Sequence, residues 1–227
     1  MGVLLSEARR SVTSWCRRNT IGGDGAVAAI RRGQSDRPDG LSRAQELELI
    51  DVLRGTYPEQ FGLTEQLWTR ESLAALIQRR YQATLSPAGV GDYLRAWGIG
   101  PRKPTERACS LCVDSVGRWL ASDYPSIEES ARVHHAGLYW VGRTRLYGVV
   151  PALDILSAVS TQGQVQFVIA APTADQPLVR DFLLRLSGRE GRSVHVVVDG
   201  SWTRAEWPRR LPARIVPYAL PSCGRAA

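Results

Sequence analysis

The strongest constraint on the fold is a change in the spacing of apolar residues near residue 137 of this 227-residue chain. Before that point apolar residues recur every three or four positions, as they do on one face of a helix. After it, the runs LYWVGRTRLYGVV, LDILSAVST and QVQFVIAA are rich in β-branched and aromatic residues, with turn signals at Pro151 and Gln162-Gly163. The pattern predicts a helical first half followed by a sheet.

The order of elements in the second half follows from the same reading. The three β-rich runs predict an antiparallel meander, and QPLVRDFLLRLSG then predicts a helix. The apolar run SVHVVVDG predicts a buried strand, a short helix carries Trp202 and Trp207, and ARIVPYAL predicts a last strand. The predicted order is β-β-β-α-β-α-β, in a mixed α + α/β fold.

The helical half contains strong start and stop signals between residues 41 and 98. Ser42, Thr69 and Ser86 each stand at a plausible N-cap position before an amphipathic run, and Gly98 is a plausible stop. The last two runs, WTRESLAALIQRRY and SPAGVGDYLRAWG, are separated by a short turn. Helix, turn and capped helix are typical of a helix-turn-helix, here of winged-helix-like type.

Polar and Pro-flanked stretches divide the chain into three parts. The run EARRSVTSWCRR predicts a short basic helix, and a second short helix is followed by the polar stretch GQSDRPDG. A second linker, IGPRKPT, follows the helix-turn-helix. We therefore predict a partial helix-turn-helix at 1–36, a second helix-turn-helix at 37–104, and an α/β domain at 105–227.

The net charge of +7 comes almost entirely from arginine, because Lys103 is the only lysine among 29 basic residues. Arginine forks match phosphates and guanine edges, so the charge favours nucleic acid as a partner. A solvated basic surface on a protein from a GC-rich genome, whose codons favour arginine, explains the same composition. Charge alone leaves both interpretations open.

The chain contains no apolar run near the roughly 20 residues that span a bilayer. The apolar stretch in its first residues, MGVLLSEARRSV, is too short for a signal peptide. The four cysteines have no disulfide-framework spacing. We expect a cytoplasmic protein with reduced cysteines and no membrane contact.

Four segments together resemble the mariner superfamily, specifically its bacterial insertion-sequence transposases of the IS-six-thirty type. They are Leu67–Pro104, Leu138–Trp140, Ile155–Ile169 and Val194–Gly200. The resemblance covers nearly the whole chain. It implies a bipartite helix-turn-helix region followed by a ribonuclease-H-like domain, in which three carboxylates hold two divalent metals for attack at phosphate.

The chain departs from this family at the catalytic acids. Gly142 stands where the resemblance implies the first carboxylate, and Arg143 replaces its acidic neighbour. Asp199 matches the second carboxylate, and the chain ends at LPSCGRAA before a third acid. Asp154 is interpreted as a surface acid. We expect no catalytic residues, no bound metal, no cofactor and no strand cleavage, with Asp199 as a residual acid.

There are two other candidate metal sites. Cys109 and Cys112 have the spacing of half a zinc site, for which His134 and His135 are possible partners. Small residues on one helix face and solvated histidines explain these positions better. A lone Mg²⁺ on Asp199 is the second candidate, but a strand-end acid that caps the next helix is the simpler interpretation.

The helix from Pro87 to Trp97 is the predicted recognition helix. Its predicted contacts to bases are Asp92, Tyr93 and Arg95, with Ser86 at its start. The predicted phosphate contacts are Arg79, Arg80, Arg102 and Lys103 around that helix and Arg9, Arg10, Arg17 and Arg18 in the N-terminal unit. The alternative is that Val90 and Leu94 are core residues and the arginines are merely solvated.

Our hypothesis is a transposase-derived protein that binds double-stranded DNA as a co-opted regulator or chromosome-associated factor in the cytoplasm, at the bacterial nucleoid. The resemblance implies a homodimer, and a protein partner of the C-terminal domain is possible. The alternatives are an active transposase, with an unrecognised acid or one from another chain, and a protein-interaction module that exposes Trp202 and Trp207. A decayed gene product is the last alternative.

Overall fold

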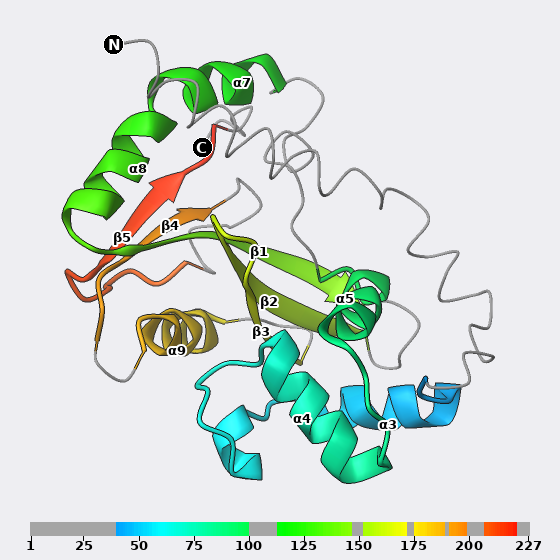
Figure 1. Cartoon of the computed structure of the whole chain (residues 1–227). Helices are drawn as coiled ribbons and strands as arrows, with labels where there is room; N and C mark the ends of the chain where they lie inside the picture. Colours follow the sequence, from blue (N-terminus) through cyan, green and yellow to red (C-terminus); the bar gives the residue numbers. More distant parts are fainter. Residues whose placement is uncertain are drawn as a thin grey trace.

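The computed structural model describes residues 40–99, 113–146, 152–171, 175–188, 191–198 and 207–221. It consists of a helical part, residues 40–99, and a sheet with helices on both faces (Figure 1). None of the helices in these ranges is long and apolar enough to cross a lipid bilayer.

The helical part begins each of its α-helices with the cap that the sequence predicts. Its elements are α3 (Arg43–Leu53), the 3-10 helix η1 (Pro58–Phe61), α4 (Arg70–Tyr81) and α5 (Pro87–Ala96). The side chains of Ser42, Thr69 and Ser86 accept hydrogen bonds from backbone N–H groups in the first turns of α3, α4 and α5. These bonds satisfy donors that the start of a helix leaves unpaired.

The described strands form one mixed five-stranded sheet in the order β3-β2-β1-β4-β5. The strands are β1 (Gly137–Leu146), β2 (Leu153–Ser160), β3 (Val165–Ala170), β4 (Val194–Val198) and β5 (Ile215–Ala219). β1, β2 and β3 pair antiparallel, whereas β4 and β5 run parallel to β1. The predicted meander, the helix after it and both later strands are confirmed. The predicted helix at Trp202 falls outside the described residues.

One face of the sheet is covered by α9 (Gln176–Leu186). Val179, Phe182 and Leu183 of this helix are fully buried, in the same cluster as Leu156 of β2 and Val196 of β4. Asp175 caps the helix by accepting from the N–H of Leu178 (3.1 Å). Burying such large side chains stabilises the layer, at about 1.5–3 kcal/mol for each.

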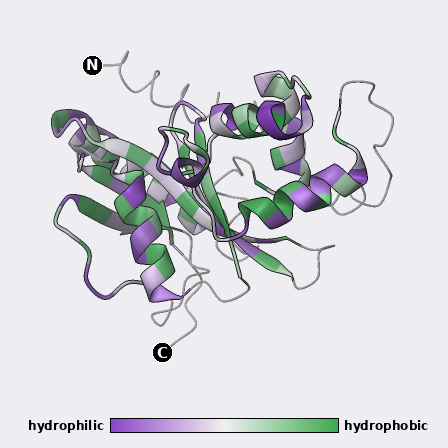
Figure 2. Cartoon of the chain, turned by 90° about the horizontal axis from the view of Figure 1, so that it is seen from below, coloured by the Kyte–Doolittle hydropathy of each residue, from purple (hydrophilic) through white to green (hydrophobic). Residues whose placement is uncertain are grey.

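The opposite face is covered by α7 (Val113–Ser122) and α8 (Tyr124–Val133), which lie across the sheet from α9 (Figure 1). Tyr124 and Ile127 pack there with Trp140 of β1, and the rings of Tyr124 and Trp140 are 5.3 Å apart. Figure 2 shows mostly hydrophobic strands at the centre and helices with alternating hydrophilic and hydrophobic bands. The helices therefore turn one side to the sheet and the other to solvent.

The helical part pairs directly with the edge strand β3. The backbone of Trp68 forms an antiparallel bridge with Phe167, through N–H···O bonds of 3.1 and 2.9 Å, and Gly55 donates to the carbonyl of Ile169 (2.8 Å). Trp68 is fully buried, and its indole donates to Thr56 O (2.9 Å). These contacts cover an edge that would otherwise expose unpaired backbone groups.

A polar clamp joins the helical part to α9. The Tyr57 hydroxyl donates to Asp181 Oδ2 (2.7 Å), and the Arg185 guanidinium lies 3.6 Å from the centre of the Tyr57 ring. Arg185 also pairs with Asp181 (2.9 Å) and Glu59 (3.0 Å). Burial, followed by the hydrogen bond to Asp181, raises the pKa of Tyr57. The helical part also contributes buried side chains to the hydrophobic cluster that holds Trp140 of β1 and Phe167 of β3. The predicted boundary at residue 104 falls between described ranges.

Candidate nucleic-acid interface

α4 and α5 form a compact pair joined by a short turn. Gln82 ends α4 in the left-handed conformation (φ 56°), which reverses the chain after the last turn of the helix. The Thr84 hydroxyl donates to the side-chain oxygen of Gln78 (2.6 Å) and fixes the turn before Ser86 caps α5. Two capped helices in this arrangement have the geometry of a helix-turn-helix.

The two sides of α5 differ sharply. Val90, Gly91 and Leu94 are buried against the rest of the helical part. The other side, which we call the outward side of α5, consists of Pro87, Ala88, Asp92 and Arg95. It has small residues near the helix start and a single arginine, 59% exposed, near its end. A helix with this profile allows the backbone of a ligand to come close at its N-terminal end.

Comparison with known families bears directly on this pair. Residues 64–120 match the family model described as winged helix-turn-helix, a span that includes α4 and α5. The chain carries a winged helix-turn-helix domain. This domain indicates DNA binding, because helix-turn-helix folds place their second helix in the major groove. No curated protein and no solved structure matches the chain.

Arg95 is the predicted base-contacting residue that the winged helix-turn-helix domain presents most openly. Its guanidinium pairs with the carboxylate of Asp92, three residues earlier on the same side of α5. Both side chains are exposed in part, so the pair is accessible from solvent. A carboxylate that holds a guanidinium fork in one orientation prepares it for a planar acceptor such as a guanine edge.

Tyr93 is placed differently from the sequence-based expectation. Its hydroxyl accepts a hydrogen bond from the N–H of Leu41 (2.8 Å), and its ring lies 6.5 Å from that of Trp97. The Tyr93 side chain is therefore half-buried and connects α5 to the start of α3. Since it is used inside the fold, it is not part of the outward side of α5.

Arg79 and Arg80 are exposed in the last turn of α4, and both have partners in the chain. Arg79 donates to the carbonyl of Phe61 (3.0 Å), and Arg80 pairs with Glu48 of α3 (2.6 Å). The hydrogen bond from Arg80 to Glu48 raises the pKa of that guanidinium. Exposed ion pairs of this kind contribute little to stability and exchange partners readily, so a phosphate can replace Glu48 at small cost.

Several predicted site residues lie outside the described residues. They are Arg9, Arg10, Arg17, Arg18, Arg102, Lys103, Asp199 and, with the zinc alternative, Cys109 and Cys112. The prediction of a partial helix-turn-helix at 1–36 lies there too.

The sheet places Gly142 and Asp154 on opposite faces. Gly142 of β1 is buried opposite Ser157 of β2. Arg145, three residues after Gly142 on β1, is opposite Asp154 of β2. Because side chains alternate along a strand, an odd separation puts the two positions on different faces. Asp154 therefore does not occupy the place of an acid at Gly142.

The interpretation of Asp154 as a surface acid is wrong. The residue is 1% exposed, and its Oδ1 accepts from Arg145 Nε (3.0 Å) in a cross-strand ion pair. Its Oδ2 is buried with no hydrogen-bond partner. The arginine on the neighbouring strand compensates the buried charge, and a buried acid of this kind needs such a partner.

The histidines of the zinc alternative lie at the end of α8. His134 and His135 are exposed, and His134 Nδ1 lies 2.8 Å from the carbonyl of Ser130. Within the part of the chain that the structure describes, no three His, Cys, Asp or Glu side chains are grouped as metal ligands.

Proposed function

We propose that this chain is a double-stranded DNA-binding protein that docks α5 of its winged helix-turn-helix domain into the major groove. The observation that carries the proposal is the family match at residues 64–120, on a helix pair with its apolar side in the core. Ser86, Arg79 and Arg80 contact phosphates beside the groove, and Arg95 contacts a base edge.

The composition of the outward side of α5 predicts modest sequence discrimination. Pro87 and Ala88 have no hydrogen-bonding side-chain groups, so direct readout depends on Arg95 and on Asp92, which orients it. Most of the affinity then comes from arginine–phosphate contacts of a chain with net charge +7, and it falls steeply as salt rises.

We propose further that the chain derives from a transposase and acts without cutting DNA, as a regulator or a chromosome-associated factor. The sheet order β3-β2-β1-β4-β5, with three antiparallel strands followed by two parallel to β1, supports a ribonuclease-H-like domain. Gly142 at the place of the first acid, and Asp154 on the other face, support the loss of cleavage. With Gly142 at the first position, Asp199 lacks the acid that would share two divalent metals with it.

The experiment compares two matched arginines by fluorescence anisotropy with a short duplex. Arg95 and Arg132 are both exposed, and each pairs with an acid three residues earlier, but Arg132 lies on α8. Arg95→Gln is expected to weaken binding to the preferred duplex by about 1–3 kcal/mol, whereas Arg132→Gln leaves it unchanged. Equal effects of the two substitutions would remove α5 from the interface.

A further inference from the structure

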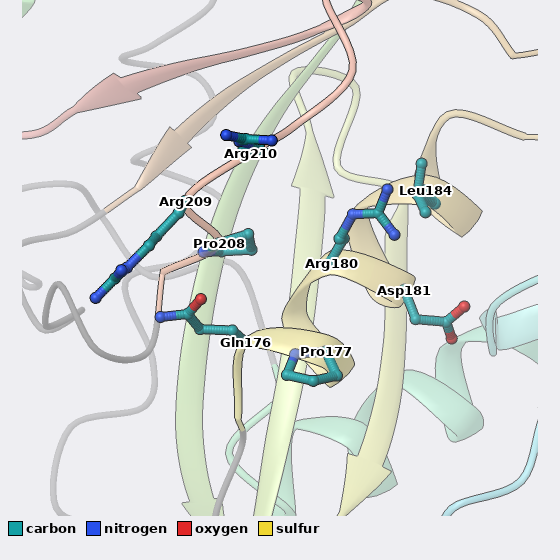
Figure 3. A pocket seen from close by; sticks show the side chains of 8 residues that line it. All are labelled: Gln176, Pro177, Arg180, Asp181, Leu184, Pro208, Arg209 and Arg210. Carbon is teal, nitrogen blue, oxygen red and sulfur yellow. The ribbon is translucent and has the colours of Figure 1, made fainter.

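A second basic surface lies between α9 and residues 208–210. It is an open pocket of about 660 Å³, which we call the α9 pocket. Arg180 of α9 faces it from one side, and Arg209 and Arg210 line it from the other (Figure 3). Gln176 and Pro208 complete the wall between them.

The charge of the α9 pocket is not compensated within the described part of the chain. Arg180, Arg209 and Arg210 are exposed, and no carboxylate among the described residues pairs with them. The acid in the lining, Asp181, is already bound by Tyr57 and Arg185, and Figure 3 shows its carboxylate directed away from Arg209 and Arg210. The pocket therefore presents three guanidinium groups to solvent.

The backbone on both sides of the pocket is held by the fold. α9 is anchored to the sheet through Val179 and Phe182, which are fully buried. On the other side, Pro208 is buried immediately before Arg209 and Arg210, and Leu211 packs against the same core as α9. Both arginine-bearing segments are thus attached to the buried core next to the pocket.

We propose that the α9 pocket is a second nucleic-acid contact, which takes a phosphodiester segment of the DNA bound by the winged helix-turn-helix domain. Guanidinium forks match phosphate oxygens, and an open pocket admits a continuous backbone rather than enclosing a small ligand. The clamp of Tyr57, Asp181 and Arg185 joins α9 to the helical part, so both surfaces belong to one packed frame. This inference rests on the proposed function for the identity of the ligand.

Arginine footprinting tests the two surfaces in one sample. The full chain is treated with phenylglyoxal, with and without duplex DNA, and the modified arginines are identified by mass spectrometry. Arg180, Arg209 and Arg210 are expected to be protected by duplex, as is Arg95, whereas Arg132 on α8 stays reactive. Inorganic phosphate or polyglutamate at matched charge concentration is expected to protect none of them.

The outcomes separate this inference from the proposed function. Protection of Arg95 alone would overturn the α9 pocket and leave the proposed function standing. Protection of the pocket alone would support the pocket and remove α5 from the interface. Equal protection of the pocket by inorganic phosphate or polyglutamate would assign it to small anions or acidic proteins and overturn the nucleic-acid assignment.

A substitution gives an independent measurement. The double substitution Arg180→Gln and Arg210→Gln removes exposed charges from the pocket without touching the core. The slope of log affinity against log salt is expected to fall in magnitude by about 0.9 for each phosphate that the variant no longer binds. Arg132→Gln is the matched control, and a slope equal to that of the control would overturn the inference.

Discussion

Two arginine-bearing surfaces of this chain differ in how their charges are held. On the winged helix-turn-helix domain, Arg80 and Arg95 pair with Glu48 and Asp92. In the α9 pocket the arginines have no such partners among the described residues. An arginine held by an acid is oriented but partly neutralised, whereas an unpaired arginine attracts any phosphate. Arg95, oriented by Asp92, is therefore suited to selectivity, and the α9 pocket to affinity that does not depend on sequence.

The largest expected effect tests whether the two sides of α5 have separate roles. Leu94→Ala removes a fully buried side chain and is expected to lower the free energy of unfolding by roughly 2–5 kcal/mol. The neighbouring substitution Arg95→Ala removes an exposed side chain and is expected to change that free energy by less than about 0.5 kcal/mol. Urea denaturation measures both, and similar losses would contradict the assignment of an outward side.

A smaller effect is expected at the phosphate-binding arginines beside α5. Replacing Arg79 and Arg80 with Ala is expected to weaken binding to every duplex sequence alike. It should also reduce the salt slope by about 0.9 for each phosphate released, as in the α9 pocket. Anisotropy titrations across a salt series measure this slope. An unchanged slope would mean that Phe61 and Glu48 retain these arginines when DNA binds.

A still smaller effect on DNA affinity is expected when a paired arginine loses its acid. Glu48→Gln removes the acid that holds Arg80 and leaves the arginine in place. Affinity for duplex DNA of any sequence is expected to rise only a few-fold, because an exposed ion pair is weak. Titration of unrelated duplexes measures the gain. If affinity falls instead, Glu48 is needed to position Arg80 and does not compete with phosphate for it.

The smallest effect is expected for strand cleavage. Supercoiled plasmid incubated with the chain and Mg²⁺ or Mn²⁺ should show no nicking above the protein-free control, and Asp199→Ala should not alter the result. Metal-dependent nicking that Asp199→Ala abolishes would establish an active transposase or nuclease and contradict the proposed loss of cleavage.

The parts of the fold that depend on neighbours in sequence were predictable. Ser42, Thr69 and Ser86 cap helices as expected, because a cap bonds to a backbone group only a few residues ahead. The change of apolar spacing near residue 137 likewise indicated where the sheet begins, since strand and helix periods differ.

The features that sequence reasoning missed depend on contacts between distant segments. The burial of Asp154 follows from the register that sets it opposite Arg145, and no local pattern specifies that register. The sequence around Tyr93 gives no sign that Leu41, far earlier in the chain, donates a hydrogen bond to its hydroxyl. The α9 pocket has a partial signal in the adjacent arginines after Pro208, but only the fold brings Arg180 opposite them.

The measurement that tests the central claim most directly is retention of sheared genomic DNA by the purified chain at moderate salt, followed by sequencing of the retained fragments. The account predicts retention, with a short sequence preference that weakens when Arg95 is replaced by Gln and a bulk affinity that remains. A chain that retains no DNA would contradict the account and favour a protein-interaction role for the same fold.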